Sequence, residues 1–171
     1  GKLLSWPYIE MTLKILNHFG IKATVQHSGS GNKLITVESQ TYNPLEIIIS
    51  KDWSAASYFY EIAVLSDAAK IELPGLKHNS FQGDEIISEI MKDFGIETTF
   101  INDAAIIKKV SKPSIEMFTL DSIADTELAQ TMAFTCAALG MEADLTGLDN
   151  LSLKETDRIQ SLKNEIERGG T

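Results

Sequence analysis

"SEIMKDFGIETTF", residues 88–100, decides the fold, because an amphipathic helix pattern ends in Phe-Gly-Ile and runs directly into β-forming residues. The stretch "KILNHFGIKATV", residues 14–25, has the same organisation around Gly20. The interval from Gly20 to Gly95 equals the interval from Gly95 to Gly170, which lies in "EIERGGT". Because the glycine interval and the order of the surrounding elements agree, the sequence indicates an internal repeat.

The segments between these glycines define the repeating unit. Helices are predicted over residues 8–19, 52–66, 84–94 and 127–139, and from about residue 155 onward. Strand patterns occur on both sides of "SGSGN" (28–32) and over residues 45–50, 69–75, 96–100, 104–110, 114–120 and 143–147. The order helix, three strands, helix, strand is a circular permutation of the element order in a βαβαββ unit. We therefore expect an α/β (α+β) fold built from repeated βαβαββ units.

Composition limits the classes of function. The chain has 171 residues, of which 43% are hydrophobic and 23% charged, as is typical of a globular protein with one sizeable domain or two small ones. Its formal net charge of -9 argues against a broad nucleic-acid or anionic-membrane surface. No apolar run approaches the roughly 18–20 residues of a membrane span. Cys136 is the single cysteine and lies in an apolar run, so we expect a reducing, cytoplasmic location.

The two ends of the sequence favour a piece of a longer repeat protein. The chain begins without Met and inside one repeating unit, and it stops at Thr171, where a strand should follow the last helix. We therefore expect more protein on both sides of this segment.

The charged stretch "LSLKETDRI", residues 151–159, is the most informative candidate site. If a helix begins near Glu155, Lys154 and Arg158 share one face at its electropositive start, where like charges repel by roughly 0.2–0.5 kcal/mol. A bound phosphate or carboxylate would make this arrangement favourable. Alternatively, Glu155 and Asp157 neutralise the two cations, and Glu155 is also a candidate general acid or base.

The stretch "LSLKETDRI" resembles the "KETDRI" signature of the 5-enolpyruvylshikimate-3-phosphate synthases, also called 3-phosphoshikimate 1-carboxyvinyltransferases. The resemblance extends in order to "SWPYIEMTL" (5–13), "KDWSAASYF" (51–59), "LKHNSFQGD" (76–84) and "ELAQTMAFTCAAL" (127–139). Together these motifs cover nearly the whole chain. The polar stretch "NSFQGD" within them has the pattern of a loop and helix cap rather than of a binding site.

The resemblance implies a fold of two domains, each made of three βαβαββ units, that close over a cleft. Residues 1–50 would end the first domain and residues 51–171 would begin the second, with a hinge near residues 50–52. The family transfers the enolpyruvyl group of phosphoenolpyruvate to the 5-hydroxyl of shikimate 3-phosphate and releases phosphate. The resemblance implies these two substrates as partners, no metal or other cofactor, and a monomeric full-length enzyme.

The matching motifs also imply residue roles. Lys154 would contact shikimate 3-phosphate and assist proton transfer, Glu155 would donate a proton, and Arg158 would bind phosphoenolpyruvate. Further ligands of shikimate 3-phosphate would be Ser5, Tyr8 and Asn150.

The predicted base departs from the family pattern. The family has an Asp in a D-x-A-[MQ]-T setting, whereas the aligned "ELAQT" places Glu127 there, upstream of Lys154. The extra methylene of Glu moves the carboxylate by roughly an ångström, a misplacement that can cost about 100-fold in rate. We favour Glu127, as base and substrate ligand, over the rival Asp125.

Two other functions compete with this interpretation. One is a noncatalytic α/β module that binds phosphorylated small molecules, and the other is an enolpyruvyl transferase acting on UDP-N-acetylglucosamine, whose catalytic Cys motif is not visible in this sequence. The three histidines lack metal-ligand spacing. Because the family's other cationic ligands would lie outside both ends, we expect the chain alone to be inactive.

Overall fold

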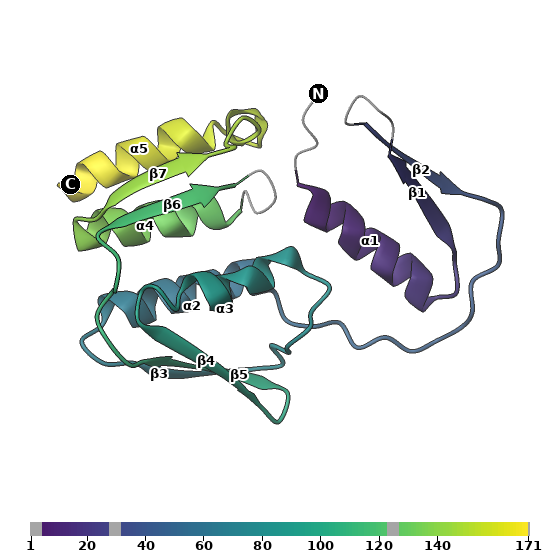
Figure 1. Ribbon diagram of the computed structural model, residues 1–171, viewed down its shortest axis with the longest axis horizontal. Coiled ribbons are helices and arrows are strands. Elements are labelled where there is room, and N and C mark those ends of the chain that lie inside the picture. Colours follow the sequence, from purple (N-terminus) through teal and green to yellow (C-terminus); the bar gives the residue numbers. More distant parts are fainter. Residues whose placement is uncertain (1–4, 28–31, 123–126, 171) are drawn as a thin grey trace.

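A computed structural model describes residues 5–27, 32–122 and 127–170 (Figure 1). Its helices are α1 (Trp6–His18), α2 (Trp53–Leu65), α3 (Ile87–Ile90), α4 (Leu128–Leu139) and α5 (Arg158–Gly169), with 3-10 helices η1 (Gly83–Ile86) and η2 (Leu151–Leu153). Its strands are β1 (Ala23–His27), β2 (Lys33–Val37), β3 (Lys70–Pro74), β4 (Ile96–Ile101), β5 (Ala104–Lys109), β6 (Met117–Asp121) and β7 (Glu142–Thr146). The mixture of helices and strands confirms the predicted α/β class.

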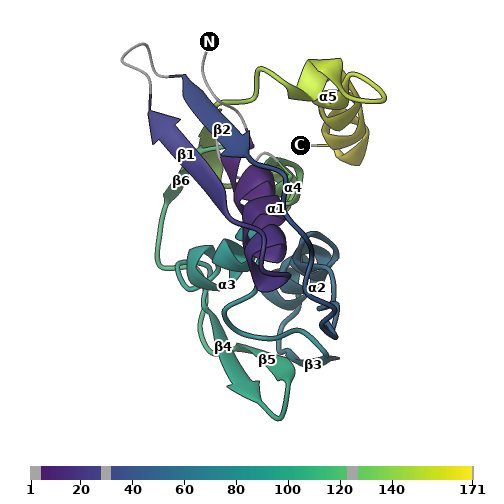
Figure 2. The same ribbon diagram turned by 90° about the vertical axis from the view of Figure 1, so that its right-hand side faces the viewer.

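The strands form three small sheets among the described residues. β1 and β2 pair as an antiparallel hairpin, and β3, β5 and β4 form an antiparallel sheet in that order. β6 and β7 pair in parallel, with Met117 opposite Glu142, and α4 connects them. Figures 1 and 2 show α1 and the hairpin beside the larger body that contains α2–α5. No helix in the described part of the chain is long and apolar enough to span a membrane.

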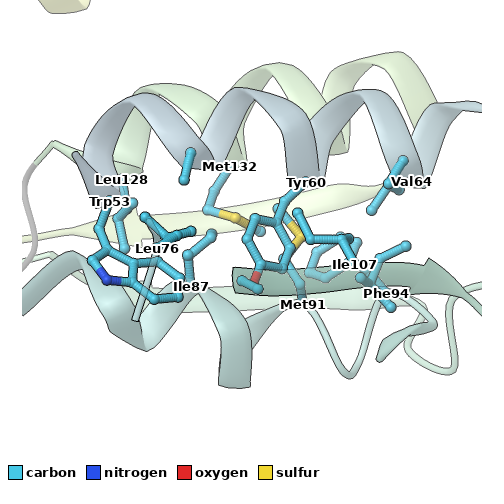
Figure 3. Packing of buried hydrophobic residues seen from close by; sticks show 14 of the residues in the cluster. Trp53, Tyr60, Val64, Leu76, Ile87, Met91, Phe94, Ile107, Leu128 and Met132 are labelled. Carbon is cyan, nitrogen blue, oxygen red and sulfur yellow. The ribbon is translucent and has the colours of Figure 1, made fainter. Parts of the chain in front are cut away.

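The hydrophobic core lies between the antiparallel sheet and helices α2 and α4 (Figure 3). Apolar residues of α2 recur at helical spacing, so that Trp53, Tyr60 and Val64 are almost fully buried. The buried Tyr60 hydroxyl satisfies its hydrogen-bonding capacity at Thr98 Oγ1, 2.8 Å away. α2 and α4 approach closely where the Ser57 and Thr131 hydroxyls hydrogen-bond at 2.8 Å.

The two predicted helix-Gly-strand junctions are confirmed and have the same geometry. Gly20 and Gly95 adopt φ of 82° and 79°, in the left-handed region that favours glycine. In both junctions the glycine N–H donates to the carbonyl three residues back, and the next N–H donates to the carbonyl five residues back. This pair of bonds is a Schellman motif, which ends the helix and turns the chain into the following strand. Gly170 also has a positive φ, of 84°, at the end of α5.

Residues 45–50 do not form the predicted strand. Ile48 and Ile49 are 81% and 87% exposed, and the segment joins no sheet in the structure as described. A β-forming sequence needs a neighbouring strand to satisfy its backbone groups, and a single strand has no such partner. The segment therefore runs as an extended connection, until Lys51 N–H donates to the Gly75 carbonyl.

The helix predicted over 84–94 is present only in part. The amphipathic pattern is correct, since Ile87, Met91 and Phe94 are fully buried. The hydrogen bonds, however, tighten to i→i+3 at both ends, as in Phe94 N–H to the Met91 carbonyl at 3.1 Å. The segment is consequently a 3-10 turn, one short α-helical turn and a series of tight turns that lead to Gly95.

Candidate active site

The last helix begins later than predicted, which changes the geometry of the charged cluster. α5 starts at Arg158, because Asp157 is its N-cap and accepts a hydrogen bond from Gln160 N–H at 3.0 Å. Lys154 precedes the helix in extended backbone. The two cations therefore do not share a helix face at i and i+4, and the predicted repulsion across one turn is wrong.

Lys154 and Arg158 nevertheless converge on one carboxylate. Lys154 Nζ lies 2.9 Å from Glu127 Oε1, and Arg158 Nη1 lies 2.5 Å from Glu127 Oε2. Glu127 is the N-cap residue of α4, so the contact joins the starts of α4 and α5. The side chains of Glu127 and Arg158 are only 23% and 18% exposed, and the pair is therefore partly shielded from solvent.

Arg158 has a second acidic partner. Its Nη2 and Nε donate to Glu155 Oε1 at 2.7 and 3.1 Å, and Nη1 also reaches Gln130 Oε1 at 3.4 Å. Gln130 occupies the [MQ] position of the family pattern, which assigns it no role, and it lies one turn after Glu127 and hence on the same side of α4. Two carboxylates thus balance the two cations. They are Glu155, as predicted, and Glu127, whereas Asp157, the second predicted partner, caps α5 instead.

The pKa values follow from these contacts. Burial raises the pKa of Glu127, but hydrogen bonds from Lys154 and Arg158 outweigh burial and lower it overall. A hydrogen bond from its own backbone, followed by one from Arg158, lowers the pKa of Glu155. Both carboxyl groups are ionised at neutral pH. Glu127 is thus in the protonation state of a base, whereas Glu155 needs an anion nearby to become a proton donor.

Glu127, Glu155 and Arg158 border an open pocket of about 420 Å³. The pocket is lined at the start of α2 by Asp52, Ser54 and Ala55, at the start of α4 by Glu127 and Gln130, and before and at the start of α5 by Glu155 and Arg158. Three helix N-termini therefore meet around it. Each contributes a partial positive charge, and together with Arg158 they suit a phosphate or carboxylate. Lys154 is not among the lining residues and is connected to the pocket through its pair with Glu127.

The other predicted substrate ligands lie in two separate places. Asn150 Nδ2 donates to Ser5 Oγ at 3.3 Å, which joins the start of α1 to η2. Asn150 Oδ1 is buried without a hydrogen-bond partner among the described residues. Tyr8 lies instead beside Asp84, a buried residue to which the sequence motifs assign no role. Tyr8 and Asp84 border a second pocket, which shares Asp52 and Ser54 with the first.

The structure leaves the rival base undescribed and gives the histidines other contacts. Asp125 lies outside the described residues. Over the ranges that are described, no group of three or more His, Cys, Asp or Glu residues is arranged to hold a metal ion. His78 instead pairs with Glu85 at 2.6 Å and stacks on Phe100.

Comparison with known proteins is consistent over the full length of the sequence. Residues 1–171 match the family EPSP synthase (3-phosphoshikimate 1-carboxyvinyltransferase). The chain is 39% identical over 170 residues to the 3-phosphoshikimate 1-carboxyvinyltransferase of Bacteroides fragilis (strain YCH46) and 30% identical to that of Methanosarcina acetivorans. It covers 40% and 39% of these two proteins, so it spans about two fifths of their length.

A solved structure gives the same fold. The EPSP synthase of Acinetobacter baumannii superposes with a TM-score of 0.53 at 20% identity, over 88% of this chain and 35% of that one. At this identity the likeness concerns the fold alone.

Proposed function

The chain belongs to the EPSP synthase family, and on that basis we propose that it provides part of the active site for transfer of the enolpyruvyl group from phosphoenolpyruvate to the 5-hydroxyl of shikimate 3-phosphate. The observation that carries the proposal is the meeting of Lys154 and Arg158 with Glu127 where three helices begin. Both substrates are polyanions. A site of two cations and three helix N-termini can stabilise the charge on such groups.

The proposed roles are those that the matching family motifs imply for these residues. Arg158 binds the phosphate or carboxylate of phosphoenolpyruvate, and Lys154 contacts the shikimate substrate. Glu127 removes the proton of the attacking hydroxyl, and Glu155 donates a proton to the methylene carbon. Shikimate 3-phosphate is held by Ser5, Tyr8 and Asn150.

Substrate binding requires an exchange of partners around Arg158. Glu127 and Glu155 both hold its guanidinium, at 2.5 and 2.7 Å. A phosphate or carboxylate at the same place displaces at least one of them. Its negative charge then raises the pKa of the displaced carboxyl group, which turns Glu155 toward the protonated form that a donor needs.

The remaining family expectations are part of the same proposal. Residues 1–50 end one domain and residues 51–171 begin the next, with the hinge near residues 50–52. The chain alone is inactive, since it spans only about two fifths of its curated relatives. Cytoplasmic location and a monomeric full-length enzyme remain predictions. The match of the whole chain to EPSP synthase does not favour the noncatalytic module or the UDP-N-acetylglucosamine transferase.

A chimera tests the function directly. The chain replaces the matching segment of the Bacteroides fragilis relative, and phosphate release is followed with phosphoenolpyruvate and shikimate 3-phosphate. Isothermal titration with shikimate 3-phosphate measures binding separately. We expect both binding and turnover, and binding without turnover would contradict the enzymatic role.

A matched pair of arginine variants then tests the site. Arg158→Ala should lower kcat/KM for phosphoenolpyruvate by at least about 10-fold, or roughly 1.4 kcal/mol. Arg168→Ala is the control, because Arg168 lies in the last turn of the same helix and pairs with the exposed Glu165 at 2.6 Å. Equal kcat/KM values for the two variants would show that Arg158 is a solvated surface charge and does not bind phosphoenolpyruvate.

A further inference from the structure

The side chain of Gln82 fastens the segment that enters α2. Its Oε1 accepts a hydrogen bond from Trp53 N–H at 2.7 Å. Its Nε2 donates to the Lys51 carbonyl at 2.8 Å and to Ser50 Oγ at 3.0 Å. The amide thus uses its acceptor and both donor hydrogens on the segment 50–53. "NSFQGD" is therefore a cap, as predicted, but it caps α2 rather than the helix that follows it.

Asp84, two residues later, lies between α2 and α1. It is 3% exposed, and its carboxylate accepts a hydrogen bond from Ser54 Oγ on α2. Tyr8 of α1 borders the same pocket as Asp84. Burial raises the pKa of Asp84, while the bond from Ser54 and the Tyr8 side chain oppose that rise. No Lys, Arg or His within the described ranges forms an ion pair with it.

Stability alone does not account for this carboxylate. A buried charge without a cation is costly, and an apolar residue of similar size often stabilises such a position. The Ser54 and Tyr8 side chains next to Asp84 both line pockets. Ser54 lines the pocket that contains Arg158, and Tyr8 lines the adjoining one.

We propose that Gln82 and Asp84 are positioning residues, which fix α1 and its ligand Tyr8 relative to the pocket that contains Arg158. Gln82 fixes residues 50–53, which lead into α2. Asp84 lies between α2 and α1 and fixes their relative position. The chemical identity of the ligand rests on the proposed function. The positioning itself does not, because it can be measured without substrate.

Spin-label distances between α1 and α2 measure the positioning. Labels are attached at Lys14→Cys on α1 and Asp67→Cys just after α2, both exposed positions. Cys136 is buried and burial raises the pKa of its thiol to about 11, so it stays unlabelled. The unsubstituted pair should give a narrow distance distribution. Circular dichroism confirms that each variant is folded.

Asp84→Leu and Asp84→Asn form the decisive comparison. Both remove the charge, but only Asn keeps an oxygen that accepts from Ser54. Asp84→Leu should widen the distance distribution at least about twofold, and Asp84→Asn should keep it narrow, because only Leu removes the polar contacts of this position with Ser54 and Tyr8. An unchanged width in Asp84→Leu, or equal widening in both variants, would overturn the proposal.

Two further variants guard against misfolding. Gln82→Leu should also widen the distribution, and an unchanged width there contradicts the role of Gln82 even if Asp84→Leu does not fold. Glu89→Leu is the control, since Glu89 is an exposed carboxylate of α3 that pairs only with Lys92 among its described neighbours. Its distribution should match that of the unsubstituted pair.

The kinetic test uses the chimera. Asp84→Leu should raise KM for shikimate 3-phosphate about tenfold while kcat falls by a smaller factor, because positioning affects a ligand and not the reacting atoms. Unchanged KM despite a widened distribution would overturn the role in the reaction. An inactive unsubstituted chimera would instead contradict the proposed function and leave the distance comparison to decide the positioning.

Discussion

Glu127 Oε2 lies 2.5 Å from Arg158 Nη1, so the predicted base and the predicted cation for phosphoenolpyruvate are each other's partners. Lys154 binds the other oxygen of the same carboxylate at 2.9 Å. The site therefore carries its own substitute for an anionic ligand. Occupying it with substrate means exchanging one anion for another rather than filling a purely cationic pocket.

Removing the Glu127 charge should strengthen anion binding and weaken the fold. In Glu127→Gln, Lys154 and Arg158 lose their shared partner, so inorganic phosphate should bind the chain about 10-fold more tightly. The free energy of unfolding should fall by about 1–2 kcal/mol, because two partly buried cations lose a charge partner. Isothermal titration and urea unfolding measure the two effects. Glu165→Gln removes the exposed partner of Arg168 and should change neither phosphate affinity nor stability. Equal phosphate affinities for Glu127→Gln and the unsubstituted chain would contradict the proposed exchange of Glu127 for a bound anion.

Acid should remove the contribution of Glu127 to stability. Its pKa lies below the ordinary 4.5 in the folded state, so the stabilisation is complete above about pH 4.5 and is lost as the pH falls through the folded value. The difference in unfolding free energy between the unsubstituted chain and Glu127→Gln should therefore shrink only at acid pH. Urea unfolding from about pH 3 to pH 7 measures it.

Glu61 provides the opposite sign in the same experiment. Burial raises its pKa in the folded chain, so its ionised form opposes folding above the unfolded pKa. Glu61→Gln should stabilise the chain at neutral pH, and that gain should disappear in acid. If the difference in unfolding free energy between a variant and the unsubstituted chain were constant across the pH range, the pKa shift of the substituted glutamate would be contradicted.

The parts of the fold that the sequence predicts are those fixed by local hydrogen bonds. The helix-Gly-strand junctions at Gly20 and Gly95 depend on residues within one turn, and both are confirmed. The start of α5 is also local, but it differs from the prediction because Asp157 is a stronger N-cap than the residues near Glu155. The strand predicted over 45–50 is absent for another reason, since a strand exists only if a distant segment pairs with it.

In the candidate site, too, local features could be predicted from the sequence, whereas contacts between distant segments could not. The sequence places Lys154 and Arg158 in one short motif, but the shared helix face predicted from their spacing is absent. Their meeting at Glu127 depends on how α4 packs against α5, across 27 and 31 residues of sequence. Asp84 and Tyr8, which line one pocket, are still further apart in the sequence, and nothing in "NSFQGD" itself identifies α1 as its neighbour.

The choice between Glu127 and Asp125 as base is open to a kinetic test. In the chimera, Glu127→Gln should lower kcat by at least about 100-fold, because the amide cannot accept the hydroxyl proton. Asp125→Asn should leave kcat within about threefold of the unsubstituted value. The phosphate-release assay with both substrates at saturation measures each. Loss of turnover only in Asp125→Asn would show that the alignment of "ELAQT" with the family motif is wrong.

Glycine should be required at the repeat junctions, and most strictly at the second. Gly95→Ala forces a side chain onto φ of 79° and brings its Cβ against the Ser111 carbonyl oxygen, which is backbone and cannot rotate away. We expect a loss of more than about 2 kcal/mol in the free energy of unfolding. Gly20→Ala has the same strain, but its Cβ meets only the end of the Asn43 side chain, so the loss should be smaller.

Gly169→Ala is the matched control for this series. Gly169 is the last residue of α5, has no left-handed φ, and a Cβ there meets nothing within 4 Å. Alanine should therefore leave stability unchanged or raise it by up to about 1 kcal/mol. Urea unfolding of the three variants should rank Gly95→Ala below Gly20→Ala and both below Gly169→Ala. Equal midpoints for Gly95→Ala and Gly169→Ala would mean that the junction does not depend on the left-handed glycine that the repeat places there.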